Sequence, residues 1–153
     1  MIGIYAKAFS KHYIPVAQSL CERRHFSDRN RFLQLKQTFE TLWKSGVIPI
    51  ANENDVVSDL ELRLSDNDEL ATLLAAGFGA QWLMFCTPVG GLLDHDGKRE
   101  EHITHIDQQV LVLANPSKSS LGHGGMVYKL SLAESVKHVT NLPVQSGEIL
   151  LET

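Results

Sequence analysis

The stretch Val47-Ile48-Pro49-Ile50-Ala51-Asn52-Glu53-Asn54-Asp55 joins a short apolar run directly to a polar cluster. Such a run, preceded by Gly46 and closed by polar residues, is typical of a buried strand, and Pro49 favours a position near a sheet edge. A second polar cluster, Ser65-Asp66-Asn67-Asp68, precedes the apolar residues 70–76. Because each cluster adjoins an apolar segment, we expect their amides and carboxylates to gather at one edge of a core, where α/β domains bind small polar ligands.

Apolar spacing in the rest of the chain predicts alternating helices and strands. Helices are expected over residues 1–11, from Ser27-Asp28 to Gly46, from Asp66 to Gly77 and Gly79, and over 126–139; strands are expected over 14–20, 47–51 and 82–87, briefly at 103–107 and within 142–151, with a small hairpin at 56–64. Strands that alternate with helices through short connections predict a parallel sheet covered on both faces. The fold class is therefore α/β.

The two central helices carry recognisable start signals. Asp28 and Asp66 are suitable N-caps, and Asp68 and Glu69 in the first turn of the second helix complement its dipole. The helix that ends at Gly46 is amphipathic. Its apolar stripe, which we expect to be core, comprises Phe32, Leu35, Phe39, Leu42 and Trp43.

The composition fits one globular domain. The 153 residues are 43% hydrophobic and 21% charged, with a formal net charge of −4. Without a basic footprint, nucleic-acid binding is not expected. No apolar stretch is long enough to span a bilayer, and the start lacks the apolar core of a signal peptide, so no membrane association is expected. Cys21 and Cys86 are far apart in sequence, which favours a reduced, cytoplasmic protein over a disulfide-stapled secreted one.

The segment Gly122-His123-Gly124-Gly125-Met126-Val127-Tyr128-Lys129 combines glycines, a helix start and a lysine. Glycines let the backbone expose successive N–H groups, the helix N-terminus adds a positive dipole end, and Lys129 adds a point charge. Together these groups suit a phosphate. The alternative is a glycine-rich loop that only turns into a helix, because short glycine patterns recur by chance.

The polar clusters also have purely structural interpretations. Asp66 alone could be only a helix N-cap, worth about 1 kcal/mol, and Asn52 and Asn54 could simply stabilise a turn after a strand. The presence of two clusters favours a binding role. His102 and His105 are three residues apart, but no third and fourth ligand stands at zinc-like spacing, so no metal site is predicted.

Taken together, these motifs resemble the glutamate 5-kinase branch of the amino acid kinase family. The stretches that carry the resemblance are 49–55, 65–68, Thr87 with Gly91-Leu92, 122–129 and, upstream, 26–32. The resemblance covers nearly the whole chain and fades after about Val139. It implies a three-layer sandwich with a mainly parallel sheet, forming a single partial amino acid kinase domain over residues 1–153.

The resemblance implies transfer of the γ-phosphoryl group of ATP, accompanied by Mg²⁺, to the side-chain carboxylate of L-glutamate in proline biosynthesis. Amino-acid binding is then assigned to Asn52, Asp55, Asp66 and Asn67. Asp68 would organise the catalytic lysines, of which Lys129 is one. Nucleotide contacts are implied for Thr87, His123, Gly124, Gly125, Met126 and Lys129. Proline is implied as a feedback inhibitor at the glutamate site, and the chain is expected to form a homo-oligomer, a dimer or a tetramer.

Some features of the family are expected to be missing. Its opening strand, which carries phosphate-gripping lysine, glycine and serine residues, and a later serine-bearing loop have no counterpart before Met1. Pro88 stands where an aspartate is usual, and His123 and Tyr128 stand where threonines are usual. The alternative is therefore a truncated, non-catalytic relative that binds glutamate, proline or a partner subunit. A kinase for another carboxylate or for carbamate is a third interpretation.

Overall fold

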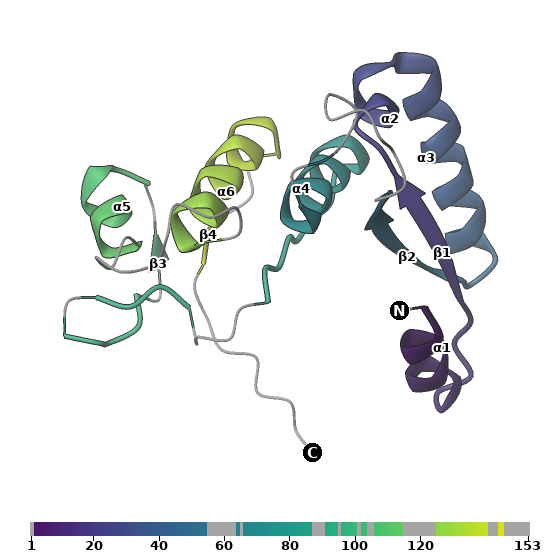
Figure 1. The fold of residues 1–153 in the computed structure, drawn as a ribbon, viewed down its shortest axis with the longest axis horizontal. Helices are drawn as coiled ribbons and strands as arrows, with labels where there is room; N and C mark the ends of the chain where they lie inside the picture. The colour runs from purple at the N-terminus through teal and green to yellow at the C-terminus, as the bar shows by residue number, and fades with distance from the viewer. Residues whose placement is uncertain are drawn as a thin grey trace. The chain divides into compact units, whose positions relative to one another are not determined.

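A computed structural model describes residues 2–54, 64, 66–86, 91–94, 96–100, 102–103, 106–114, 125–140 and 144–145. It divides into an N-terminal unit, Met1–Leu70, and a C-terminal unit, Ala71–Thr153, each of which is described by itself. In chain order the elements are α1 (Ile2–Ser10), β1 (Val16–Cys21), α2 (Arg24–Ser27), α3 (Arg29–Lys44), β2 (Ile48–Glu53), α4 (Asn67–Phe78), β3 (His102–Ile103), α5 (Gln108–Ala114), α6 (Met126–Thr140) and β4 (Val144–Gln145) (Figure 1).

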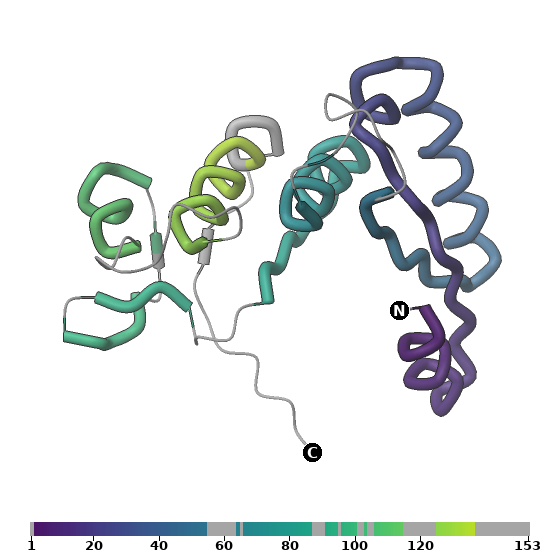
Figure 2. The backbone as a smooth tube through the Cα atoms, viewed as in Figure 1, coloured from purple at the N-terminus to yellow at the C-terminus, as the bar shows by residue number. Residues whose placement is uncertain are grey.

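The N-terminal unit is built on a parallel pair of strands. β1 pairs with β2 in register from Val16 opposite Ile48 to Cys21 opposite Glu53, so the carboxyl ends of both strands meet at one edge. α3 connects them, lying beside the pair (Figure 2). This crossover is the one that parallel strands require, and it confirms the predicted strand-helix-strand unit. The backbone N–H of Ile48 donates to the carbonyl of Pro15, so Ile48 faces β1.

α3 begins and ends where the sequence predicts. The side chain of Asp28 accepts from the backbone N–H of Arg31 at 2.9 Å, and the helix is followed by Gly46, which takes φ 70°. Leu35 and Phe39 on its apolar stripe are buried.

The prediction that Trp43 lies in the core is wrong. The exposed fraction of Trp43 is 48%, and its ring packs edge-on against Phe39 with the centroids 5.8 Å apart. Trp43 occupies the last turn of α3, so this contact covers one side of the ring and the rest faces outward. An amphipathic pattern predicts which face of a helix is apolar, but not how far the core extends along it.

α4 also has the predicted ends. The side chain of Asp66 accepts from the backbone N–H of Glu69 at 2.9 Å, and Gly79 follows the helix at φ 64°, a conformation that favours glycine. Leu70 is fully buried. Apart from Leu64, the hairpin predicted at 56–64 lies outside the described residues.

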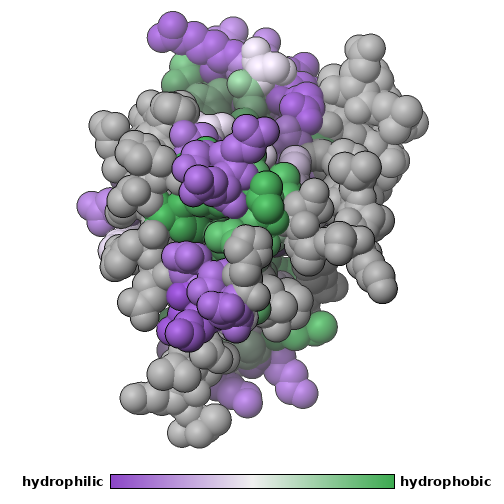
Figure 3. All heavy atoms as spheres, turned by 90° about the vertical axis from the view of Figure 1, so that its left-hand side faces the viewer, coloured by the Kyte–Doolittle hydropathy of each residue, from purple (hydrophilic) through white to green (hydrophobic). Residues whose placement is uncertain are grey.

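The C-terminal unit has a small core of its own. This core comprises Leu92, Ile103, Ala114 and Leu130, contributed by a turn region, β3, α5 and α6. β3 and β4 form an antiparallel pair in which His102 lies opposite Gln145. Seen from the side of α5, the surface carries apolar areas bordered by hydrophilic ones (Figure 3). The helix predicted at 126–139 is confirmed as α6, whereas α5 was not predicted. The strand predicted within 142–151 is present as β4, and β3 shares only Ile103 with the strand predicted at 103–107.

The prediction of a buried strand at 82–87 is wrong for its described part. Residues 82–86 form neither helix nor strand, and Trp82 and Met84 are 74% and 62% exposed. No described strand pairs with this segment, so it has neither a hydrogen-bond ladder nor a sheet face against which to bury its side chains. Within the described residues, no helix is long and apolar enough to cross a membrane.

Candidate functional site

The two polar clusters meet at the carboxyl end of β2, as the sequence predicts. Nδ2 of Asn67, the first residue of α4, donates to Oδ1 of Asn52 at 2.9 Å. Oδ1 of Asn67 accepts from the backbone N–H of Glu53 at 3.1 Å. Nδ2 of Asn52 donates in turn to the carbonyl of Glu53 at 3.0 Å. A closed set of amide hydrogen bonds therefore fixes the start of α4 against the end of β2.

The two carboxylate oxygens of Asp66 have different surroundings. Oδ1 caps α4 through the backbone N–H of Glu69, whereas Oδ2 is buried and receives no hydrogen bond from the described part of the chain. A buried carboxylate oxygen without a donor is costly, so this position suits a donor supplied by a ligand. Asp68 lies half-buried in the first turn of α4, where its charge complements the helix dipole. Asp55 lies outside the described residues.

Charged residues that the sequence reasoning missed complete this edge. Oε1 of Glu22 accepts from Nδ2 of Asn54 at 2.7 Å, and Oε2 pairs with Nε of Arg24. Nη2 of Arg23 contacts both carboxylate oxygens of Glu69, at 2.7 and 2.9 Å. Their signal was the charged run Glu22-Arg23-Arg24 directly after β1, which parallels the polar cluster directly after β2. These pairs link β1, β2 and α4.

The environments of Glu22 and Cys21 shift their pKa values in opposite senses. Burial disfavours the charged form of Glu22, but the hydrogen bonds from Asn54 and Arg24 and the charges of Arg24 and His25 together hold its pKa below the ordinary 4.5. Burial raises the pKa of the Cys21 thiol, and the charge of Glu22 adds to this against a hydrogen bond with Ser19. At neutral pH, Glu22 is therefore a carboxylate and Cys21 a protonated thiol.

Glu22→Gln is expected to lower the free energy of unfolding at pH 7 by about 1.5–3 kcal/mol, the contribution of hydrogen bonds to a charged group. The folded-state pKa of Glu22 is depressed, so its contribution is complete above the ordinary value of 4.5 and is lost as pH falls through the folded-state value. Urea denaturation of both proteins between pH 7 and pH 3 should show the difference shrinking with acid. Glu40→Gln on α3 is the control; a Glu22→Gln difference that stays constant would contradict the assignment.

The two cysteines are expected to differ in reactivity. Cys21 is fully buried and Cys86 is exposed. Because the thiolate is the reactive form, burial and the raised pKa both protect Cys21. Titration with a chromogenic disulfide reagent should modify one thiol per chain in the folded protein and two in denaturant. Loss of the fast thiol in Cys86→Ser would assign it, whereas rapid modification of that variant would show that Cys21 is accessible.

Three residues that the sequence predicts to contact nucleotide are described, and they lie in the C-terminal unit: Gly125, Met126 and Lys129. Gly125 precedes α6, and its carbonyl accepts from the backbone N–H of Lys129 at 3.1 Å, which closes the first turn. Nζ of Lys129 lies 5.6 Å from the centroid of the Phe85 ring. Phe85 stands two residues before Thr87 in the sequence, so Lys129 contacts the segment that leads to Thr87. Met126 packs against the core of this unit, whereas Thr87, His123 and Gly124 lie outside the described residues.

These residues fit a phosphate group better than a metal ion. A fifteen-residue helix that begins at Met126 offers its N-terminal amides, and Lys129 adds an ammonium group in the first turn. Among the described residues, no group of three or more histidine, cysteine, aspartate or glutamate side chains could hold a metal ion. Mg²⁺ that accompanies a nucleotide is held largely by phosphate oxygens and water, which needs no such group.

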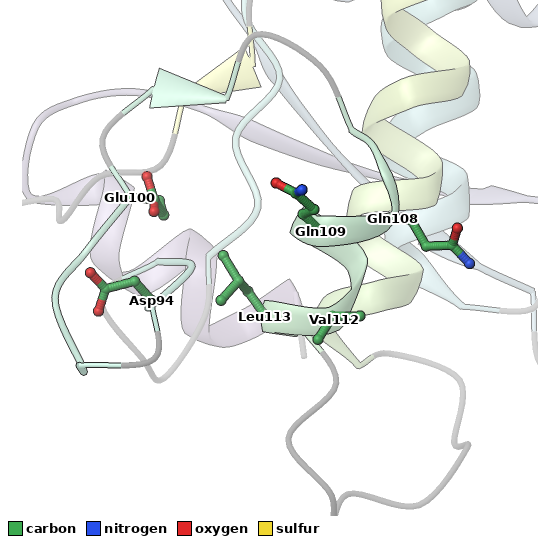
Figure 4. A pocket seen from close by; sticks show the side chains of 6 residues that line it. All are labelled: Asp94, Glu100, Gln108, Gln109, Val112 and Leu113. Carbon is green, nitrogen blue, oxygen red and sulfur yellow. The ribbon is translucent and has the colours of Figure 1, made fainter.

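A cavity of about 440 Å³ lies elsewhere in the C-terminal unit. Figure 4 shows Asp94 and Glu100 on one side of it and Gln109 and Leu113 of α5 on the other. Oδ1 of Asp94 already accepts from the backbone N–H groups of Asp96 and Lys98, at 2.9 and 2.8 Å. None of the described residues that line this cavity was predicted to bind substrate, and its carboxylate at Asp94 stabilises a turn.

Comparison with known proteins extends the resemblance over the chain. Residues 1–145 match the Amino acid kinase family. The glutamate 5-kinases of Gloeobacter violaceus and Herpetosiphon aurantiacus are 39% identical over 139 residues and 38% identical over 154 residues. These alignments cover 87% and 96% of this chain, but 37% and 42% of the two relatives. The chain thus spans about two fifths of the length of these curated relatives. Since the family match takes in every described helix and strand, this protein belongs to the amino acid kinase family.

Proposed function

We propose that this chain contributes to a glutamate 5-kinase-type reaction, in which ATP phosphorylates the side-chain carboxylate of L-glutamate. The observation that carries the proposal is the hydrogen bonding of Asn67 to Asn52 and Glu53, which joins both polar clusters at the carboxyl end of β2. The relatives named above are glutamate 5-kinases, which supports the choice of substrate. In the proposed assembly the two units form one partial kinase domain.

The proposed amino-acid site comprises Asn52, Asp55, Asp66 and Asn67. Asp66 would bind the ammonium group of glutamate through its buried Oδ2, which would provide that oxygen with a donor. Asn67, whose side chain is already fixed by two hydrogen bonds, would need no reorganisation to bind a carboxylate through its remaining N–H group. Pre-ordered polar groups of this kind hold a reactant in line at little entropic cost.

The proposed nucleotide site comprises Thr87, His123, Gly124, Gly125, Met126 and Lys129. In the transfer, an O–P bond forms from the glutamate carboxylate and the bond between the γ-phosphorus and its bridging oxygen breaks, leaving ADP. Lys129 would neutralise charge on the transferring group, and Asp68 would orient the lysines. ATP supplies the phosphoryl group and Mg²⁺ screens its charge; this chain's own contribution is binding and orientation.

A hydroxamate assay tests the proposal on the 153-residue chain. Formation of glutamyl hydroxamate that depends on ATP, Mg²⁺ and L-glutamate is expected, together with heat stabilisation of the protein by glutamate and by proline. Stabilisation without product would favour the non-catalytic alternative, for which Pro88, His123 and Tyr128 are the supporting departures. The absence of both product and stabilisation would overturn the proposal. Sedimentation of the same sample tests the proposed dimer or tetramer.

A further inference from the structure

Glu22 is a buried charged residue that the proposed function leaves unused. It follows β1 directly, and its exposed fraction is 6%. A buried carboxylate is costly unless it is paired and hydrogen-bonded. Glu22 has Arg24 on Oε2 and Asn54 on Oε1, and its own backbone N–H donates to Nδ1 of His25 at 2.9 Å. Arg24 compensates the charge of Glu22. The hydrogen bond between Glu22 and Asn54 therefore mainly fixes the orientation of the Asn54 side-chain amide.

This bond determines which end of the Asn54 amide is left without a described partner. An ionised carboxylate only accepts hydrogen bonds, so Asn54 must turn Nδ2 toward Glu22, and Nδ2 lies 2.7 Å from Oε1 of Glu22. The backbone N–H of Asn54 is held as well, by the carbonyl of Cys21 at 2.9 Å. The other end of the amide is the carbonyl oxygen Oδ1, which receives no hydrogen bond from any described residue. The Asn54 amide can both donate and accept hydrogen bonds, but its bond to Glu22 engages the NH₂ group and leaves the acceptor oxygen available.

Asn54 and Asp66 flank the same hydrogen bond. The backbone N–H of Glu53 donates to Oδ1 of Asn67. Asn54 directly follows Glu53 in the chain, and Asp66 directly precedes Asn67. Each neighbour keeps one acceptor oxygen without a described donor, Oδ2 of Asp66 and Oδ1 of Asn54. An ammonium group has three donors and no acceptor, so it matches a pair of such oxygens.

We propose that Glu22 is a positioning residue of the amino-acid site: it holds Asn54 with Oδ1 outward, so that this oxygen accepts from the ammonium group of the bound amino acid. The inference rests on the proposed function, since it refines the same site. It adds a selectivity rule. A ligand with the ammonium group is preferred over the same dicarboxylate without it, and Glu22 sustains that preference without touching the ligand.

Glu22→Gln should reverse the amide. Arg24 requires an acceptor, so the introduced glutamine would turn its oxygen toward Arg24 and its NH₂ group toward Asn54. Asn54 would then rotate to present Oδ1 inward and Nδ2 outward, where two donors would face the ammonium group. We expect glutamate to bind at least about tenfold more weakly in this variant, the loss of a hydrogen bond to a charged group. Glutarate, which lacks the ammonium group, should bind as it does to the wild-type chain.

Titration calorimetry of glutamate and glutarate against the full chain tests this, with the affinity ratio as the readout. In the double variant Glu22→Gln/Asn54→Asp, the glutamine can donate to the new carboxylate, whose second oxygen faces outward, so the ratio should recover. Asn54→Ala provides a second test should Glu22→Gln unfold, and it should lower the ratio similarly. An unchanged ratio in folded Glu22→Gln or Asn54→Ala would overturn the inference alone. A wild-type chain that binds neither ligand would overturn the proposed function and this inference with it.

Discussion

Lys129→Ala is expected to reduce ATP-dependent hydroxamate formation by at least about 10²-fold, the usual cost of removing one group that stabilises transition-state charge. Lys129 is the lysine in the first turn of α6, where its ammonium group adds to the positive end of the helix. Alanine is a good helix former, so α6 should persist. The measurement is the initial rate at saturating glutamate and ATP, with circular dichroism as the check on folding.

Lys137→Ala is the matched control, because it removes a lysine from the same helix eight residues further along the chain. It should retain the wild-type rate. Glutamate should stabilise Lys129→Ala as much as the wild-type chain, since the residue is assigned to the phosphoryl group and not to the amino acid. A Lys129→Ala chain with more than half of the wild-type rate would exclude the assigned role.

Asp66→Ser is expected to weaken glutamate binding by roughly 30-fold or more while leaving the melting temperature nearly unchanged. Serine keeps the N-cap hydrogen bond of α4 but lacks the second carboxylate oxygen. Truncating one partner of a buried charge pair costs about 2–5 kcal/mol of binding energy. Asp66→Ala should lose both the cap and the ligand contact, so it should bind weakly and melt earlier. The measurements are titration calorimetry and thermal unfolding.

This pair of variants separates the capping role of Asp66 from its proposed role in binding. If capping were its whole role, serine would restore wild-type affinity and alanine alone would be impaired. Asn30→Ala removes an exposed amide from α3 and should change neither measurement. Wild-type affinity in Asp66→Ser would therefore remove Asp66 from the site and leave it as a cap.

The helices could be predicted because their boundaries depend on local chemistry. Asp28 and Asp66 accept hydrogen bonds from backbone groups three residues away, and Gly46 and Gly79 take the left-handed conformations that follow the two helices. Each signal is contained in a few consecutive residues. The meeting of the two polar clusters was predictable for a related reason, since each cluster directly adjoins an apolar segment of the sequence.

Features that depend on distant residues were not predictable in this way. The partner of Glu22 is Asn54, which lies 32 residues away, and nothing in either residue type identifies the other. The segment 82–86 has the composition of a buried strand, but a strand also needs a neighbouring strand, and composition carries no information about that neighbour. The same limit applies to Trp43, whose exposure depends on how far other elements extend along α3.

Pro49 makes the two edges of the β1–β2 pair unequal in their ability to pair with a further strand. Residues whose N–H groups face β1 alternate with residues whose N–H groups face the opposite side, and Ile48 faces β1. Pro49 therefore faces away from β1, on the side where an added chain would seek a donor that proline lacks. Residues 16–21 of β1 contain no proline, and among the described strands they pair with β2 alone, so their outer side is competent to template a further strand. A further extended chain is therefore expected to pair more readily with the outer edge of β1 than with the outer edge of β2.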